Sequence, residues 1–224
     1  MPLAPTTDAM LCIWHDVEAD HVEEYLRWHS FQHLPERLAL PGFQLARRYE
    51  RLEGPGQRFF CVLDVRALAD FETPQYQARL DTPTEWTRRL MPRYGRVHRS
   101  LCRKLWELGA GLTGLAACVR IAGAGNAALI DALARLCTRQ IALQTVAFAQ
   151  LGGLEATVSN RDSAEKRLRR DEDSGGYDLV LLLGGLSRQS LHSALEDIEA
   201  LLEKHRLRRE SSLYALSCAL GQNS

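Results

Sequence analysis

The stretch WHSFQHLPERLALPGFQLARRY, from Trp28 to Tyr49, joins the end of an amphipathic helix to the start of a strand. It places His29 and His33 four residues apart, so on a helix both imidazoles lie on one face. Two imidazoles so placed can hold a metal, bind an anion when protonated or move a proton near neutral pH. The stretch therefore predicts where a site lies, without revealing the reaction.

The helix that carries the two histidines has one stripe that should meet the sheet. Its members are Val22, Tyr25, Leu26, His29, His33 and Leu40. The histidines therefore take positions where aliphatic residues are usual. Pro35 cannot donate to the Phe31 carbonyl and its ring clashes there, so we expect the helix to kink or restart at Pro35.

The first half of the chain reads as six elements in the order β-α-β-β-α-β. Periodicity predicts strands over 10–17, 43–52, 58–65 and 97–108, a helix over 21–40 and a broken helical region over 67–94. This order is that of a ferredoxin-like sheet, in which the first and third strands are central. Here those strands contain CIWHDV and FFCVLDV, which are richer in apolar residues than the outer strands.

The second half repeats this order, although its sequence differs. We predict strands over 115–122, 143–150, 177–186 and 212–220, and helices over 126–138 and 188–205, with Asn126 as an N-cap. The link Gly109-Ala110-Gly111 marks the boundary. The chain is therefore predicted to be an α+β protein of two tandem ferredoxin-like units, residues 1–109 with the candidate site and residues 110–224 as a degenerate second unit.

The least core-like stretch is NRDSAEKRLRRDEDSGG, over residues 160–176. Its charges nearly cancel, and it stands where the second half lacks a clear β-hairpin. We predict a solvated loop with about one helical turn. A lid over a site is the alternative interpretation.

The composition of the 224-residue chain argues against two classes of partner. Lysine plus arginine equals aspartate plus glutamate, 28 each, which predicts no binding to nucleic acid. No apolar run approaches the roughly 20 residues of a membrane span, so we predict no membrane association.

The start of the sequence, MPLAPTTDAM, lacks the features of a secretory signal. Six widely spaced cysteines without a C-x-x-C pair are typical of a reducing compartment, so we predict a cytoplasmic protein without structural disulfides.

No cofactor-binding or common catalytic motif is present in the sequence. There is no G-x-G-x-x-G, P-loop, G-x-S-x-G or H-E-x-x-H pattern. We therefore predict no cofactor and no metal. A zinc site would need three or four ligands, and His29 and His33 supply two, so Glu36 or Asp64 would have to complete the set.

Four stretches of the first half resemble the dimeric α+β barrel superfamily, and within it EthD-like proteins and an uncharacterised bacterial branch of them. These stretches are LCIWHDV, YLRWHSFQHLPERLALPGFQLARRY, RFFCVLDV and TPQYQARLDTPTEWTRRLMPRYGRVHRS. The resemblance implies two ferredoxin-like units packed sheet against sheet as a barrel, here an intrachain pseudo-dimer. The superfamily includes cofactor-free monooxygenases, cyclases, haem-handling enzymes and lactone isomerases, so the resemblance specifies the fold better than the activity. The second half lacks a counterpart of the histidine run, so we expect the site in the first half alone.

The candidate site residues fall into two groups. The catalytic candidates are His29, His33 and Arg37. The substrate-binding candidates are Trp14, Asp16, Trp28, Arg48, Asp64 and Tyr94. Imidazoles suit proton transfer, guanidinium groups bind carboxylates, phosphates and oxyanions, and large aromatic side chains can line a cavity.

Each candidate also has a purely structural interpretation. The histidines could be satisfied by backbone carbonyls or by Asp16, and Arg37 could pair with Asp64 or Glu36. Arg47 and Arg48 point to opposite faces of their strand, so at most one faces a given pocket. The aromatic residues could be plain core.

Our functional hypothesis is a barrel that binds a small organic molecule, aromatic or polyketide-like, which can be neutral or anionic. It would act as a cofactor-independent monooxygenase or cyclase, with His29 or His33 transferring a proton and Arg37 or Arg48 stabilising an oxyanion. The alternatives are a non-enzymatic binding or regulatory barrel and a haem-binding protein with an axial histidine. The chain is expected to be a monomer with an internal pseudo-dimer, or a homodimer.

Overall fold

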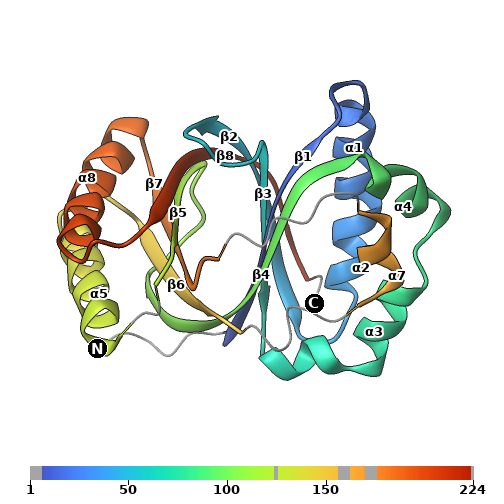
Figure 1. Ribbon diagram of the computed structural model, residues 1–224, viewed down its shortest axis with the longest axis horizontal. Helices are drawn as coiled ribbons and strands as arrows, with labels where there is room; N and C mark the ends of the chain where they lie inside the picture. Colours follow the sequence, from blue (N-terminus) through green and yellow to red (C-terminus); the bar gives the residue numbers. More distant parts are fainter. Residues whose placement is uncertain (1–6, 124–125, 156–161, 170–175, 223–224) are drawn as a thin grey trace.

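Eight antiparallel strands close into one barrel, with helices packed on its outside (Figure 1). This computed structural model describes residues 7–123, 126–155, 162–169 and 176–222. The strands are β1 (Ala9–Val17), β2 (Phe43–Glu53), β3 (Phe59–Val65), β4 (Tyr94–Gly109), β5 (Leu115–Ile121), β6 (Phe148–Leu154), β7 (Leu179–Gly185) and β8 (Arg209–Gly221).

The order of the strands around the barrel is β1-β3-β2-β8-β5-β7-β6-β4. Each half contributes four consecutive strands, ordered β2-β3-β1-β4 and β6-β7-β5-β8. In both, the first and third strands are central, as the sequence predicts. The third strands, β3 and β7, are buried along their whole length. The pairs β2–β8 and β4–β6 join the halves, so two tandem ferredoxin-like units form one α+β barrel.

The two faces of each strand have different environments. Along β1, Met10, Cys12 and Trp14 point into the barrel, where strands of both halves share one apolar cluster. The alternate residues Leu11 and His15 face outward, toward the helices. This alternation follows from the period of two in a β-strand. It divides the first half's candidate residues between the barrel interior and the helix–sheet interface.

The helical layer of the first half is broken into short pieces. They are η1 (Ala19–His21), α1 (Val22–Trp28), η2 (His29–His33), α2 (Leu34–Leu38), η3 (Leu68–Glu72), α3 (Pro74–Asp81), α4 (Glu85–Leu90) and η4 (Met91–Arg93). The segment η2 is a single π-helical turn between α1 and α2. Pro35 stands in the first turn of α2, so the helix restarts where the sequence predicts.

The second half has longer and plainer helices. α5 (Ala127–Ala142) begins at the predicted N-cap, because Asn126 Oδ1 accepts a hydrogen bond from the Leu129 backbone N–H at 2.9 Å. α8 (Arg188–Lys204) packs beside α5 over the second half's sheet. One predicted strand is shifted: α5 continues to Ala142, a turn follows, and β6 starts only at Phe148. The apolar residues after Leu143 do not distinguish a helix end from a strand.

The segment predicted as a solvated loop contains the short helix α7 (Ala164–Leu168). Residues 160–161 and 170–175 of that prediction lie outside the described residues. Although α7 belongs to the second half of the chain, it packs against α3 and η4 of the first half (Figure 1). Glu165 is buried rather than solvated. The second half therefore covers part of the first half's helix–sheet interface.

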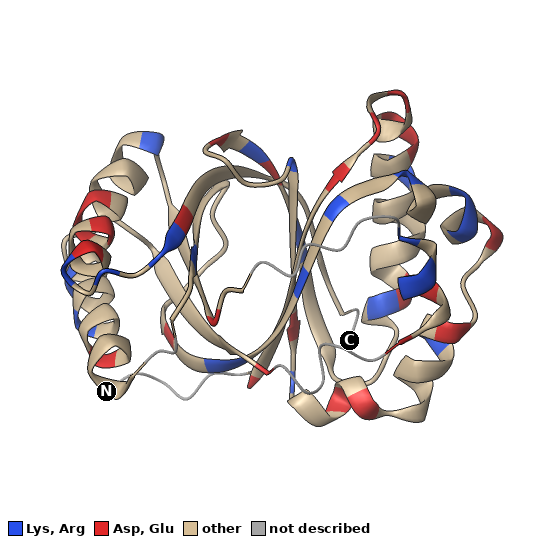
Figure 2. Ribbon diagram, viewed as in Figure 1, with Lys and Arg blue, Asp and Glu red and all other residues tan. Residues whose placement is uncertain are grey.

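Charged residues of both signs are interspersed on the helices flanking the barrel (Figure 2). β4 ends at Gly109 and β5 starts at Leu115, on either side of the glycine-rich link. We keep the division into residues 1–109 and 110–224 as a proposal, since the two halves share one barrel. No described helix is long and apolar enough to cross a membrane.

Candidate functional site

A small pocket lies between the helices η2 and α2 and the outer face of β1 and β3. Its lining residues are Leu11, Ile13, His15, His29, His33, Leu34, Arg37, Cys61, Leu63, Met91, Tyr94 and Arg169. The pocket has a volume of about 30 Å³. That volume accommodates one or a few water molecules. The pocket brings together the three catalytic candidates His29, His33 and Arg37, together with Tyr94.

His29 is held in one orientation by side chains. Its Nδ1 lies 3.3 Å from Arg48 Nη1 and its Nε2 lies 3.7 Å from Cys61 Sγ. A guanidinium group can only donate, so Nδ1 accepts and the neutral ring carries its proton on Nε2. Side chains, and neither a backbone carbonyl nor Asp16, therefore contact both ring nitrogens of His29.

His33 lies beside His29, with 5.4 Å between the ring centroids, and packs on Trp28 at 4.5 Å. It is 8% exposed, yet its Nδ1 has no hydrogen-bond partner among the described residues. A buried ring nitrogen without a partner is unusual in a folded protein. Its position on the pocket wall means that a bound molecule could supply the missing hydrogen bond.

His15 is a pocket residue that the list of sequence candidates omitted. Its Nε2 is 2.9 Å from the Tyr25 hydroxyl, its ring stacks on Tyr94 with centroids 4.3 Å apart, and its buried Nδ1 has no partner among the described residues. The alternation along β1 already placed His15 opposite Trp14. The sequence offered one indication of its position: His15 lies on the face of β1 opposite Trp14, and the helical stripe that contains His29 should meet the sheet.

All three imidazoles are neutral at neutral pH. Burial, followed by the charge of nearby arginines, lowers the pKa of His15 to about 3 and the pKa values of His29 and His33 well below their usual range. Burial also raises the pKa of Cys61 to about 12 and that of the Tyr94 phenol well above its ordinary value. The pocket therefore offers neutral imidazoles, a thiol and a phenol, with positive charge supplied by arginine.

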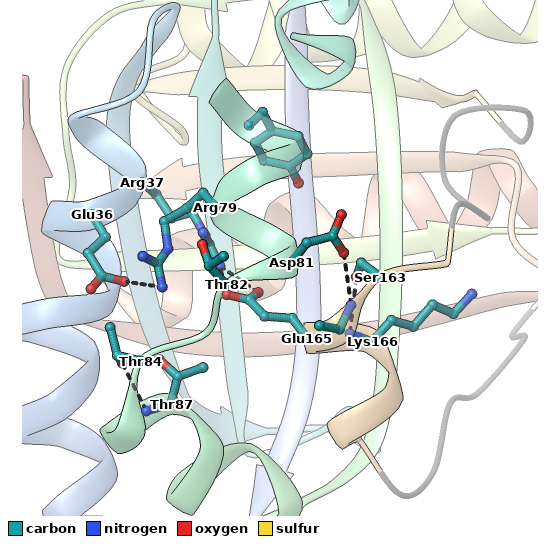
Figure 3. A network of polar contacts seen from close by, with 12 residues as sticks. Glu36, Arg37, Arg79, Asp81, Thr82, Thr84, Thr87, Ser163, Glu165 and Lys166 are labelled. Carbon is teal, nitrogen blue, oxygen red and sulfur yellow. Dashed lines mark hydrogen bonds and ion pairs between the residues drawn. The ribbon is translucent and has the colours of Figure 1, made fainter. Parts of the chain in front are cut away.

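Arg37 forms a buried ion pair with Glu165 of α7, 128 residues further along the chain. One guanidinium nitrogen, Nη2, donates to both carboxylate oxygens of Glu165, at 2.5 Å for Oε2. The other, Nη1, is buried without a partner among the described residues. The predicted ion-pair partners, Asp64 and Glu36, are thus replaced by a residue from the other half. Figure 3 shows Glu165 beside Arg37, with Asp81 next to Ser163 at the start of α7.

The second half contributes a further side chain to the pocket. Arg169 follows α7 and lies four residues after Glu165, and both face the first half. The expectation that only the first half is equipped therefore needs correction. The helix α5 is indeed chemically plain, but Glu165 of α7 pairs with Arg37 of the pocket wall, and Arg169, just after α7, lines the pocket. Local sequence patterns contain no signal for this contact, because it depends on how a connecting segment crosses the barrel.

Arg48 serves as a support for His29 and does not line the pocket. Besides its contact with His29, its guanidinium donates to Ser30 Oγ at 3.0 Å, to the Leu26 carbonyl at 3.4 Å and to Ser217 Oγ at 3.1 Å. These contacts, made by Nε and Nη1, hold the guanidinium beside His29. Arg47, its neighbour, points to the opposite face as expected and lies inside the barrel.

The remaining candidates lie outside the pocket. Trp14 belongs to the barrel interior, and Trp28 packs in an apolar cluster beneath α1. Asp64 also faces the interior, where it pairs with Arg47 and Lys104, each at 2.6 Å. Asp16 stands at the end of β1 and accepts from the Arg58 backbone N–H at 2.7 Å.

Neither carboxylate considered as a third zinc ligand faces the histidine pair. Glu36 accepts from Gln32 at 3.0 Å and pairs with Arg79 at 3.5 Å, while Asp64 is on the other side of the sheet. Within the described parts of the chain, no three His, Cys, Asp or Glu side chains converge as metal ligands would.

Comparison with solved structures identifies the fold of this chain, whereas comparison with known sequences finds no match. No protein-family model and no curated protein sequence matches the chain. An anthrone oxidase-like protein aligns with 100% of this chain and 97% of its own, at 8% identity and a TM-score of 0.67. The "putative monooxygenase" of Fusobacterium nucleatum aligns with 98% and 97%, at 7% identity and a TM-score of 0.62.

A chlorite dismutase from Candidatus Nitrospira defluvii is also similar. It aligns with 96% of this chain and 92% of its own, at 13% identity and a TM-score of 0.58. These identities are low, so the likeness shows the architecture alone. The chain has an α+β barrel fold in which one chain contributes both four-stranded units, with a histidine- and arginine-lined pocket under the helices of its first half.

Proposed function

We propose that this protein binds a small aromatic or polyketide-like molecule in the helix–sheet pocket and acts on it as a cofactor-independent monooxygenase or cyclase. It would represent an EthD-like branch of the barrel proteins. One observation carries the proposal: three buried polar atoms around one pocket, His15 Nδ1, His33 Nδ1 and Arg37 Nη1, have no hydrogen-bond partner among the described residues. Leaving such groups unpaired costs about 1–3 kcal/mol each, which a polar ligand would recover.

The geometry favours His33 over His29 as the proton acceptor. Arg48 occupies His29 Nδ1, and the proton of that ring is on Nε2, so His29 has no free lone pair to offer. His33 has an unpartnered nitrogen and, with its lowered pKa, is neutral and ready to accept a proton. A neutral ring of low basicity removes protons only from an acidic position, such as a phenol or a methylene flanked by carbonyl groups.

Arg37 is suited to hold the negative charge that proton removal leaves on the substrate. Dioxygen would be the second substrate of an oxygenation: the deprotonated, electron-rich ring is oxidised, one oxygen atom enters the product and the other leaves in water. A cyclisation would need only the proton transfer and the stabilised enolate. The pocket supplies the same two groups for either reaction.

Haem does not fit the described residues. The pocket volume of about 30 Å³ is well below the roughly 300–1,000 Å³ of pockets for drug-sized ligands. A two- or three-ring aromatic molecule would therefore need the pocket to widen, and a porphyrin would need far more widening. We therefore derive no step through haem. Titration with haemin provides the test, because axial ligation by a histidine would give a Soret band in the complex.

The first experiment compares oxidation of anthrone by the wild-type protein and by the variant His33→Ala. Anthraquinone formation and oxygen uptake above the spontaneous rate are expected for the wild type. His33→Ala should lower kcat by about 10²–10⁴-fold while binding of the product falls by less than tenfold, because general-base catalysis acts on the chemical step. His205→Ala, on the exposed end of α8, is the matched control.

A non-enzymatic binding protein is the second candidate, and the low basicity of the three imidazoles favours it. Such a protein would bind aromatic ligands, and His33→Ala would weaken binding without any turnover to lose. Binding without oxygen uptake, for a panel of anthrones and phenols, would select this alternative.

A further inference from the structure

The carboxylate of Glu165 is placed where a ligand carboxylate would sit. It belongs to α7, is 2% exposed as a side chain, and accepts hydrogen bonds on both oxygens from Nη2 of Arg37, a residue of the pocket wall. Guanidinium groups recognise carboxylates in general through such charge-assisted hydrogen bonds. The contact therefore occupies the most suitable anion-binding group on the pocket wall.

The pocket as it stands is too small for an organic ligand, with a volume of about 30 Å³. Arg169, which follows α7, lies on its wall, and Glu165 of α7 pairs with Arg37 of the same wall. This five-residue helix is attached by polar and apolar contacts, among them packing of Leu168 against the apolar cluster that contains Trp28 and Tyr94. They include the ion pair itself, an exposed hydrogen bond of 3.1 Å from the Ala164 N–H to Asp81, and packing on α3 and η4 (Figure 3).

Exchange of one carboxylate for another on Arg37 would conserve the ion pair. A buried ion pair adds little net stability compared with its replacement, whereas leaving one partner unpaired is costly. A ligand that brings its own carboxylate keeps Arg37 paired and so avoids the cost of an unpaired buried charge. A neutral ligand of the same size does not. This difference gives the pocket a physical reason to select anionic ligands.

We propose that the pocket takes an aromatic carboxylate, and that Glu165 holds the position of the ligand's carboxylate on Arg37 until the ligand replaces it. This inference rests on the proposed function and adds the class of ligand. A hydroxyl group next to the carboxylate would reach the unpartnered Nη1 of Arg37, so 1-hydroxy-2-naphthoate is a suitable probe. Its amide, 1-hydroxy-2-naphthamide, has nearly the same shape without the charge.

The experiment measures binding of both probes by isothermal titration calorimetry to the wild type, Glu165→Gln and the control Glu196→Gln. Glu196 is exposed on α8, so its replacement changes the net charge equally. In Glu165→Gln we expect the naphthoate to bind at least tenfold more tightly than in the wild type, with less than a threefold change for the amide. Glu196→Gln should change neither.

The double variant Arg37→Met/Glu165→Leu removes the ion pair without leaving a buried charge, and so guards against misfolding of the single variant. It should bind the two probes with equal affinity, which separates Arg37 from the other arginines of the pocket. A persistent naphthoate preference in the double variant, or equal gains for both probes in Glu165→Gln, would overturn this inference while leaving a binding pocket. Failure of every variant to bind either probe would overturn the proposed function as well.

Discussion

Three neutral imidazoles within one helix–sheet interface are the most unusual feature at the residue scale. His15, His29 and His33 are each less than 9% exposed, and their side chains meet other side chains rather than backbone carbonyls. A buried imidazole that is neutral avoids the cost of burying a charge, and the same ring resists protonation in the folded protein. The chemistry of the pocket and the acid sensitivity of the protein therefore have one cause.

This arrangement predicts how stability depends on pH. Above the ordinary value of 6.5, the imidazoles are neutral in the folded and the unfolded protein alike. Below it, the unfolded chain binds protons that the folded protein refuses, down to pH about 3 for His15. The free energy of unfolding should therefore fall as the pH drops from 6.5 toward 3, by up to about 1.4 kcal/mol per pH unit for each buried imidazole.

Urea unfolding at pH 7.5, 6, 5 and 4 measures this slope. His15→Phe keeps an aromatic ring against Tyr94 but cannot titrate, so its slope should be smaller by up to about 1.4 kcal/mol per pH unit. His205→Gln, at the exposed C-cap of α8, is the matched control. An unchanged slope in His15→Phe would contradict the assignment.

At the scale of elements, the π-helical turn η2 sets the direction of the helix α2 that follows it. A π turn adds one residue to a helix and rotates the next segment relative to the previous one, and such turns are frequent at functional sites. Here it lies between α1 and α2, so it aligns His29 and His33 with Arg37. Pro35, which has no N–H, follows directly and begins the new α-helical turn.

Deletion of Phe31 tests this role. The Phe31 side chain is 80% exposed, so its loss alone should matter little. Phe31→Ala is expected to change the free energy of unfolding by less than about 0.5 kcal/mol, as exposed substitutions usually do. The deletion should convert the turn to α-helix, rotate α2 and destabilise the protein by more than about 2 kcal/mol, because Arg37 would lose Glu165. Equal stability of the two variants in urea unfolding would show that the π turn has no such function.

At the scale of the whole molecule, the two halves are coupled by the barrel. The strand pairs β2–β8 and β4–β6 cross between them, the interior cluster contains residues of both, and α7 of the second half closes the pocket of the first. Neither half can expose its inner face without exposing that of the other. The barrel should therefore unfold as one unit, although each half has the strand order of a complete sheet.

The distribution of tryptophan allows a direct test of this coupling. All four tryptophans, Trp14, Trp28, Trp86 and Trp106, belong to the first half of the chain, and Trp106 packs in the apolar core of the second half. Far-UV circular dichroism reports the helices and strands of both halves. Fluorescence and circular dichroism should give the same urea midpoint, since coincident probes indicate one cooperative transition. Midpoints that differ by more than the experimental error would show that the halves unfold separately.

Local patterns in the sequence were sufficient for the elements and their order. The period of two along a strand predicted that Arg47 and Arg48 point to opposite faces, Pro35 marked the restart of the helix, and Asn126 marked the start of α5. The apolar character of β3 and β7 identified the central strands. Each of these features depends on residues that are near one another in the chain, which is why a single sequence contains them.

The tertiary structure alone decided which of these residues share a site. It separated Asp64 and Trp14 from the histidines by placing them on the inner face of the sheet, and it brought Glu165 to Arg37 across 128 positions of the chain. The sequence around Glu165 carries only the charges of an ordinary exposed loop. Pairing over such distances depends on how the barrel closes and how a connection crosses it, and neither leaves a periodic pattern in the residues involved.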